Sequence, residues 1–291
     1  MKKVYLFLTS LILLTVGSPL FARPFVRLHI PLVKPVIIKT VAEPVPTPPA
    51  VEVVEDELDI DGTLTVPEGE GPFPVVIIDS RSEGEKDFSK AIDSLVSDLA
   101  KNGIASYTFD ASKVDLFDSS VINSIEDYLS DLEEIDGSKI GLLGWDVGVI
   151  NVLQAANSNK HFDSIATWSA PQASKDSTKS NVVVSYTKKG TSWRKGETVT
   201  KKVVYTSAPD LSEKLDNISE IRIPIASFHG ENDEISPVSI SEQIQDLGSN
   251  KKNKLVLFED ADHTFNFFSK DLSTFEDLKA ETVDWFIETL K

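Results

Sequence analysis

Residues 140–148 read IGLLGWDVG, an apolar run that passes into the pattern Gly-x-Asp-x-Gly. A second apolar run, compatible with a helix, follows at residues 149–156. A strand, a sharp turn and a helix in this order make a nucleophile elbow, which holds one side chain above the edge of a sheet. Asp146 stands at the position that serine usually occupies. The chemistry expected of this chain therefore depends on a carboxylate.

Strand-like and helix-like runs alternate on both sides of this turn. The expected strands are residues 62–67, 73–79, 104–109, 140–143, 165–168, 223–228 and 254–258. The expected helices are residues 88–101, 121–132, 149–156, 238–247 and 272–290. Such alternation predicts an α/β fold, with a mostly parallel sheet covered by helices on both faces. Reactive groups then belong at the carboxyl ends of the strands.

One segment, residues 171–207, interrupts the alternation. Residues 181–186 and 198–205 favour strands and flank a short stretch with glycines, so we expect a β-hairpin insertion after the strand at residues 165–168. Basic residues gather there on an otherwise acidic chain: Lys188, Lys189, Arg194, Lys195, Lys201 and Lys202. The hairpin is either a solvated insertion or a lid that attracts an anionic substrate.

The N-terminus has the layout of a secretory signal peptide. A short basic start precedes an apolar run at residues 4–16, and a region that ends at Ala22 resembles a cleavage site. Cleavage there would export the protein to the periplasm or the outside of the cell. Leu20 is large for the position three residues before a cut, so the alternative is an uncleaved membrane anchor formed by residues 4–22.

Residues 23–50 are expected to be a proline-rich leader, and residues 51–291 the domain. Four prolines lie between Glu43 and Pro49, which favours an extended linker. With an uncleaved anchor this segment would be a stalk. After cleavage it would be a mobile leader or a segment that packs on the domain edge.

Composition excludes several classes of site and partner. The chain has no cysteine, so disulfides, thiolate metal sites and a cysteine nucleophile are excluded. Its net charge is −17, and loss of Lys2 and Lys3 with a signal peptide makes it −19. So acidic a chain disfavours nucleic acids and anionic membranes as partners, apart from an uncleaved N-terminal segment. We expect a small-molecule substrate, no metal and no cofactor; the oligomeric state has no sequence signal.

Two further segments join the elbow in carrying chemistry. Residues 228–233 read FHGEND and come at the end of an apolar strand. Residues 258–263 read FEDADH and come at the end of the last strand. An acid after the penultimate strand and a histidine after the last one complete an order of nucleophile, acid and histidine. Over residues 57–291 the chain therefore resembles the α/β-hydrolase superfamily, in its dienelactone-hydrolase-like and acyl-peptidase-like branches.

The resemblance implies an α/β-hydrolase fold and a set of site residues. Asp146 takes the place of the nucleophile, His263 that of the base, and Asp233 that of the acid that orients the base. The backbone N–H groups of Ser80 and Val147 take the place of the oxyanion hole. A histidine base needs a carboxylate that fixes its tautomer and stabilises the imidazolium form.

Each of these side chains has a structural alternative. Asp233 could cap the helix that follows it, and His263 could be a histidine at the sheet edge without a catalytic role. Asp262 competes with Asp233 as the partner of His263. His229 is interpreted as structural, and His161 as a surface residue.

Three departures from the family pattern bear on activity. The branches that use a carboxylate nucleophile usually place tryptophan directly after it, whereas Trp145 precedes Asp146 here. Asp79-Ser80-Arg81-Ser82 stands where family members usually carry His-Gly, and Asp79 would place a negative charge where an oxyanion needs donors. Residues 109–114 replace a glycine-rich turn.

The sequence leaves two functions open. A carboxylate nucleophile forms a covalent ester and suits an electrophilic sp³ carbon, such as that of an epoxide or alkyl halide. The chain would then be an exported hydrolase that uses Asp146, His263 and Asp233. The alternative is a catalytically degenerate hydrolase that serves as a binding or interaction module, with Asp146 and His263 as a buried ion pair. A serine esterase or peptidase is disfavoured, because the elbow holds no serine.

Overall fold

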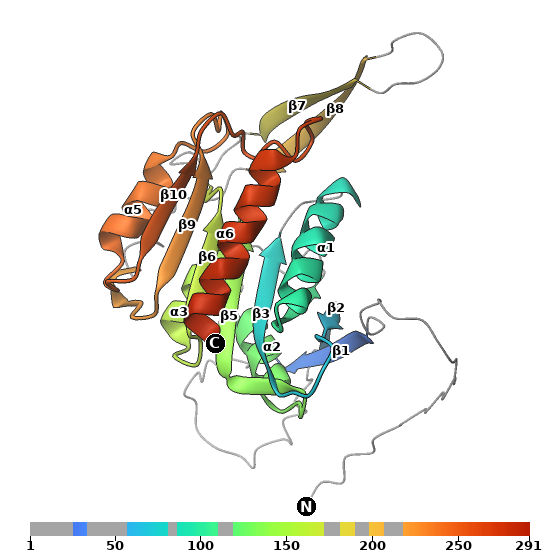
Figure 1. The fold of residues 1–291 in the computed structure, drawn as a ribbon, viewed down its shortest axis with the longest axis vertical. Coiled ribbons are helices and arrows are strands. Elements are labelled where there is room, and N and C mark those ends of the chain that lie inside the picture. The colour runs from blue at the N-terminus through green and yellow to red at the C-terminus, as the bar shows by residue number, and fades with distance from the viewer. Residues whose placement is uncertain are drawn as a thin grey trace, which may run out of the picture.

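The computed structural model describes residues 26–33, 57–80, 86–109, 119–171, 181–189, 198–206 and 218–291. An eight-stranded sheet forms its centre, in the order β1-β2-β4-β3-β5-β6-β9-β10 (Figure 1). The strands are β1 (Val26–Val33), β2 (Glu57–Thr65), β3 (Phe73–Ser80), β4 (Ala105–Phe109), β5 (Ile135–Trp145), β6 (Ser164–Trp168), β9 (Ile225–Gly230) and β10 (Lys254–Phe258). From β4 to β10 every neighbouring pair is parallel, whereas β2 pairs antiparallel with both β1 and β4.

Helices cover both faces of this sheet. They are α1 (Lys86–Lys101), α2 (Ser120–Ser130), α3 (Gly148–Ser158), α5 (Ser239–Leu247) and α6 (Ser273–Leu290), with a short 3₁₀ turn at Ile218–Glu220. Helices α1 and α6 pack on one face through one apolar cluster, and α2, α3 and α5 pack on the other through a second. The continuous apolar run of β3 serves both clusters, since Val75 and Ile77 belong to one and Val76 and Ile78 to the other. The expected α/β architecture is confirmed.

The order of the strands reverses next to β3. The chain passes from β3 to β4 on one side and returns to β5 on the other. In an open parallel sheet, the crevice at such a switch point, beyond the carboxyl ends of the strands, is where ligands bind. Asp79 at the end of β3 and Asp146 directly after β5 both lie at this edge.

The insertion after β6 is the expected hairpin. Strands β7 (Asn181–Lys189) and β8 (Thr198–Thr206) pair antiparallel as a separate two-stranded sheet. Figure 1 shows the pair projecting from the end of the molecule toward which the arrow of β3 points. The side chains of the pair and the loop between its strands lie outside the described residues, so a role as a lid stays a prediction.

Strand β1 lies inside the segment that the composition marks as a leader. It pairs with β2 over its whole length, from Val26 opposite Leu64 to Val33 opposite Glu57. A strand at this place corresponds to a segment on the domain edge. Pro31 and the basic Arg27 are residues that edge strands tolerate, which hides a strand from a search for alternating or continuous apolar runs. The expected signal peptide and the prolines of residues 43–49 lie outside the described residues.

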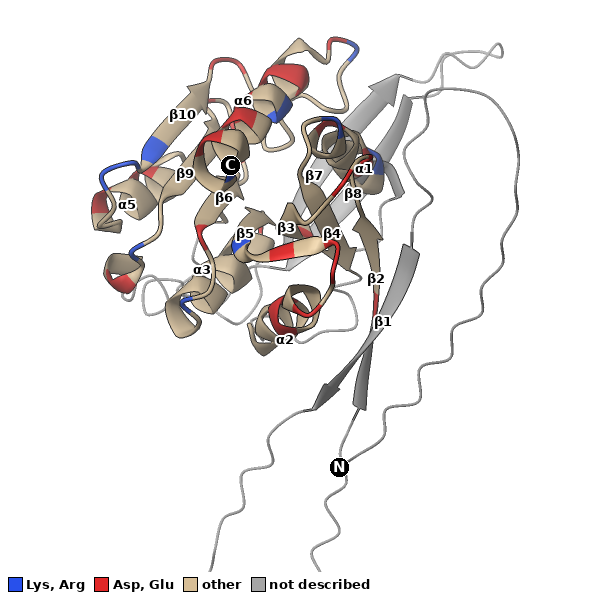
Figure 2. Cartoon of the chain, turned by 60° about the horizontal axis from the view of Figure 1, so that its bottom comes forward, with Lys and Arg blue, Asp and Glu red and all other residues tan. Residues whose placement is uncertain are grey.

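Acidic residues dominate the charged surface of the helices. In Figure 2, Asp and Glu mark α2, α5 and α6 and several connecting turns, while Lys and Arg are fewer and scattered. Among the helices that the structure describes, none is long and apolar enough to cross a membrane.

Candidate active site

Asp146 stands at the sharp turn between β5 and α3. Its φ of 51° places it in the left-handed region, which residues other than glycine seldom occupy. Two backbone hydrogen bonds fix the turn: the N–H of Asp146 donates to the carbonyl of Trp168 over 3.0 Å, and its carbonyl accepts from the N–H of Val149 over 3.0 Å. Such strain persists where the surroundings over-determine it, and it clusters at functional sites.

Two glycines give this turn its close packing. A Cβ atom on Gly148 would lie 2.0 Å from the backbone oxygen of Asp79, and one on Gly144 would lie 2.6 Å from the N and Cα atoms of Val149. The obstacles are backbone atoms, which no rotamer change can move. The Gly-x-Asp-x-Gly pattern is therefore a steric requirement of the elbow.

Replacement of Gly148 by alanine is expected to lower the free energy of unfolding by about 3 kcal/mol, because β3 and α3 must move apart. Urea denaturation of both proteins measures the difference. The control is Gly103→Ala, where a Cβ atom meets nothing closer than the Lys291 Nζ atom at 3.5 Å. That change should cost only about 1 kcal/mol, for a left-handed backbone at φ 68°. Equal losses in the two variants would contradict the steric account.

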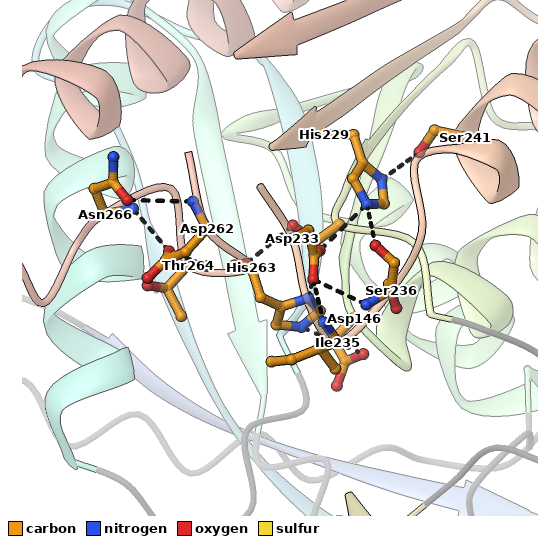
Figure 3. Close-up of polar contacts among 11 residues, drawn as sticks. Asp146, His229, Asp233, Ile235, Ser236, Ser241, Asp262, His263, Thr264 and Asn266 are labelled. Carbon is orange, nitrogen blue, oxygen red and sulfur yellow. Dashed lines mark hydrogen bonds and ion pairs between the residues drawn. The ribbon is translucent and has the colours of Figure 1, made fainter. Parts of the chain in front are cut away.

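Asp233 and His263 come from adjacent loops, which follow β9 and β10. The N–H of Asn232 donates to the carbonyl of Ala261 over 3.0 Å and holds the two loops together. His263 is buried, and its Nδ1 atom lies 2.7 Å from Oδ2 of Asp233 (Figure 3). The other oxygen of Asp233, Oδ1, accepts the N–H groups of Ile235 and Ser236, each over 2.8 Å. Asp233 thus orients His263 with one oxygen and, with the other, holds the turn formed by the residues that follow Asp233.

Asp262 is engaged locally instead. Its Oδ1 atom accepts the N–H and the hydroxyl of Thr264, each over 2.7 Å, and the N–H of Asn266 over 2.9 Å. These bonds hold the tight turn in which His263 sits, where Phe265 and Asn266 have φ values of 53° and 60°. The structure therefore pairs His263 with Asp233.

The far nitrogen of His263, Nε2, faces Asp146. The distance from Nε2 to Oδ1 of Asp146 is 3.7 Å, longer than a hydrogen bond and within the range of an ion pair (Figure 3). The structure thus brings the three side chains together in the order that the resemblance implies. Distances between a reactive group and its base are often this long when no substrate is bound.

Burial and hydrogen bonds set the charges of these groups. Burial raises the pKa of Asp146, and the nearby His263 opposes this only in part. Burial alone would also raise the pKa of Asp233, but hydrogen bonds from His229 and His263 hold it well below its usual range. Burial would lower the pKa of His263, yet its hydrogen bond to Asp233 and the charge of Asp146 raise it. Asp233 is thus a permanent carboxylate that favours a protonated His263.

The segment in the place of the oxyanion hole, at the end of β3, carries a buried carboxylate. Asp79 is buried, and its Oδ2 atom accepts the Nδ2 group of Asn151 on α3 over 2.8 Å. Ser80 ends β3 opposite Trp145, and the backbone N–H of Val147 lowers the pKa of the Asp146 carboxyl against the effect of burial. Arg81, Ser82 and residues 110–114 lie outside the described residues.

Ser169 is a site residue that the sequence analysis missed. It follows β6 with a φ of 43°, and its buried hydroxyl donates to the backbone carbonyl of His263 over 2.9 Å. It therefore helps to hold the loop that carries the histidine. The one sequence signal was its place directly after a predicted strand, at the edge of the sheet where reactive groups gather.

Two further histidines, His161 and His229, have partners of their own. His161 is exposed, and its Nδ1 atom lies 3.5 Å from Oε1 of Glu126, which places it on the surface. His229 is fully buried and contacts Asp233. In the part of the chain that the structure describes, no group of three or more His, Asp or Glu side chains is arranged to hold a metal ion.

A parallel sheet with a switch point, an elbow after β5, an acid after β9 and a histidine after β10 define an α/β-hydrolase. Known proteins agree with this class. The chain belongs to the dienelactone hydrolase family, whose sequence model matches residues 60–291. This is a family of hydrolases, and their substrates are small molecules.

One curated relative and two solved structures illustrate the similarity. The chain is 28% identical over 236 residues to 2,6-dihydropseudooxynicotine hydrolase from Paenarthrobacter nicotinovorans, across 76% of this chain and 61% of the relative. The chain thus spans less than two thirds of that relative. Its fold is similar to that of a dienelactone hydrolase from Anabaena variabilis, with a TM-score of 0.57 and 15% identity over 81% of this chain and 94% of that one. Its fold is also similar to that of the esterase domain of a Rhodothermus marinus protein, with a TM-score of 0.58 and 18% identity over 80% of this chain and 94% of that one.

Proposed function

We propose that this protein is a hydrolase in which Asp146 is the nucleophile, His263 the base and Asp233 the residue that orients the base. The observation that carries the proposal is the position of the Asp146 carboxylate, at the strained elbow and 3.7 Å from Nε2 of a histidine whose other nitrogen is bound to Asp233. A retired site has no need of this complete and mutually oriented set. The substrate class is a small molecule with an electrophilic sp³ carbon, such as an alkyl halide or an epoxide.

The reaction has two steps. In the first, an oxygen of Asp146 bonds to the carbon, the bond to the leaving group breaks, and the leaving group takes the electron pair. In the second, water gives a proton to Nε2 of His263 and its oxygen bonds to Cγ of the Asp146 ester. Collapse breaks the bond between Cγ and the alkoxide oxygen, and the alkoxide takes the proton from His263 and leaves as the alcohol. Asp146 is left as a carboxylic acid and gives its proton to solvent water to become a carboxylate again.

Two features of the site support this division of labour. The backbone N–H of Val147 lowers the pKa of the Asp146 carboxyl, so it lies close enough to polarise the ester that would form there. An attack of Asp146 on an ordinary ester would give an anhydride, which is a poor route to hydrolysis. The sp³ electrophile is therefore the better match to a carboxylate at the elbow.

The proposal predicts that turnover rises as the pH increases above 6.5, the ordinary pKa of a histidine. The second step needs neutral His263, whose pKa is raised by its hydrogen bond to Asp233 against the effect of burial. The charge of Asp146 also raises it in the free site, and ester formation removes that charge. The pH at which half of the His263 side chains are neutral therefore lies above 6.5. Steady-state rates between about pH 5 and 9 measure the profile. A rising limb centred below pH 6.5 would contradict the assignment of His263 as the base.

A degenerate hydrolase that acts as a binding module is the second candidate. Buried Asp79 favours it, because this carboxylate stands in the oxyanion segment, beside the elbow, and binds Asn151. Under this view Asp146 and His263 form an ion pair without turnover.

Turnover by the full chain on a panel of haloalkanes, epoxides, lactones and p-nitrophenyl esters separates the two candidates. Wild-type protein and Asp146→Ser are compared side by side. Wild-type activity on a substrate with an sp³ electrophile, lost in Asp146→Ser, supports the carboxylate nucleophile. A silent wild type with esterase activity in Asp146→Ser would overturn it, because it would mean a working site that lacks only its nucleophile.

We further propose that the protein is exported, with residues 1–22 removed as a signal peptide; an anchor formed by residues 4–22 is the alternative. The charged start, the short apolar run and Ala22 support export. Fractionation of producing cells, followed by N-terminal sequencing, tests it. A mature chain that begins at Arg23 is expected, and an intact Met1 in the membrane fraction would favour the anchor.

A further inference from the structure

His229 is a buried titratable group that the proposed reaction leaves unused. It lies near the carboxyl end of β9 with no exposed surface, four residues before Asp233. Its place at a strand end before Gly230 predicts a structural residue. Its contacts in Figure 3 instead connect α5 to the acid of the site.

Both ring nitrogens of His229 are engaged. Nε2 lies 2.9 Å from the backbone oxygen of Ser236 and 3.2 Å from Oδ2 of Asp233. Both of these atoms can only accept, so Nε2 carries a proton. Nδ1 lies 2.7 Å from the hydroxyl of Ser241 on α5, which can donate to it. The contacts therefore fix one tautomer of the ring.

Asp233 is the meeting point of two histidines. Its Oδ2 atom contacts Nε2 of His229 and Nδ1 of His263, the latter at 2.7 Å. Its Oδ1 atom is occupied by two backbone N–H groups, those of Ile235 and Ser236. The two imidazoles thus meet at one carboxylate oxygen: His263 is hydrogen-bonded to it, while the one hydrogen on Nε2 of His229 is hydrogen-bonded to the carbonyl of Ser236 and lies beside it. The positive end of the His229 N–H group there reduces what the oxygen can give His263.

We propose that His229 is a positioning residue: it fixes the Asp233 carboxylate and holds its Nε2–H group beside Oδ2, which weakens the hold of Asp233 on His263. The contacts form a chain from Ser241 through His229, Asp233 and His263 to Asp146. This role deepens the proposed function and rests on it, since His263 is useful as a base only if it releases its proton near neutral pH.

The sign of the effect follows from the sharing of Oδ2. Without the N–H group of His229 beside it, the full negative charge of this oxygen faces His263, and protonated His263 is stabilised. Among the described residues, the charged groups that act on His263 are Asp233, Asp146 and Asp262. In the part of the chain that the structure describes, the charged group that faces His229 is Asp233, and its other partners are Ser236 and Ser241. Removal of His229 therefore acts on His263 through Asp233.

Histidine NMR of the full chain without substrate tests the proposal. The chain has four histidines, and the signal of His263 is identified by its loss in His263→Gln. In His229→Leu, the midpoint of the His263 titration is expected to rise by at least about 0.5 pH unit. In His229→Gln the amide nitrogen can reach Asp233 in place of Nε2, so the midpoint should stay near that of the wild type. An unchanged or lower midpoint in His229→Leu, or equal shifts in the two variants, would overturn the proposal.

A second pair of variants covers a failure of His229→Leu to fold. Ser241→Ala removes the hydroxyl that donates to Nδ1 and makes Nε2 a weaker donor, so a smaller rise of the His263 midpoint is expected. The matched control is Ser106→Ala on β4, a buried serine whose hydroxyl has no hydrogen-bond partner among the described residues. Identical midpoints in Ser241→Ala and Ser106→Ala would count against the chain of contacts.

The titration is independent of turnover. A protein that is silent on every substrate but shows the shift refutes the proposed function and keeps the coupling. An active protein without the shift refutes the coupling and keeps the proposed function.

Discussion

Asp146→Asn is expected to lower kcat/KM by a factor of about 10⁴, since an amide cannot form the covalent ester. The backbone should accept the change, because asparagine tolerates the left-handed region in which Asp146 has a φ of 51°. Steady-state kinetics of the wild type and Asp146→Asn, on the substrate that the panel identifies, measure this change in kcat/KM. Wild-type kinetics in this variant would rule out Asp146 as the nucleophile.

The same variant should be more stable at neutral pH, by about 1 kcal/mol. The pKa of Asp146 in the folded state is raised above its ordinary 3.8 by burial, so the native protein binds this proton more tightly than the unfolded chain. The protonated Asp146 therefore adds stability that is fully present below pH 3.8, the ordinary pKa of the group. This stability is lost as the pH rises through the higher pKa of Asp146 in the folded protein. At neutral pH the wild type therefore carries the cost of a buried carboxylate, which asparagine avoids.

A matched control separates the two effects. Asp163 precedes β6, accepts the N–H of Ile140 over 2.9 Å and also has a pKa raised by burial. It lies at the amino ends of the strands, away from Asp146 and His263. Asp163→Asn should leave the kinetics unchanged, and a comparable loss of activity there would mean that neutralising a partly buried carboxylate is enough to disturb the protein.

His263→Ala is expected to lower turnover by a factor of about 10³ and to accumulate the covalent ester on Asp146. Attack by Asp146 does not need the histidine, whereas hydrolysis of the ester does. Intact-protein mass spectrometry after mixing with substrate should show one added alkyl group per chain, and peptide mapping should place it on Asp146. His263→Gln, which fills more of the buried space, should behave alike and guards against a loss of fold.

The control for this experiment is His161→Ala, at an exposed position whose ring lies near Glu126. It should turn over at the wild-type rate without an adduct. A His263→Ala variant that hydrolyses substrate at the wild-type rate would exclude His263 as the base. An adduct on any residue other than Asp146 would exclude the carboxylate nucleophile even if turnover fell.

The sequence located the centre of the site because the signals there are local. An elbow needs an apolar strand, two glycines and a helix start, all within residues 140–156, and each leaves a mark on residue type. The alternation of strands and helices is likewise a matter of periodicity over short windows. These determined the α/β architecture and the order of Asp146, Asp233 and His263 along the chain.

Only the tertiary structure decided which carboxylate His263 uses. Asp262 is its neighbour in the chain, yet Thr264 and Asn266 occupy its Oδ1 atom. Asp233 reaches the histidine because two loops meet across parallel strands. Competition between hydrogen bonds depends on positions in space, and the distance along the chain does not indicate the winner.

The same reason explains the residues whose roles the sequence did not reveal. Ser169 reaches His263 only once β6, β9 and β10 lie side by side, and His229 reaches Asp233 only through the shape of the turn after β9. Strand β1 is defined by its pairing with β2 rather than by its own composition. Local chemistry thus determined the fold class, the elbow and the candidate residues, while packing between distant segments decided which of them touch, because burial and hydrogen-bond partners are properties of the folded chain.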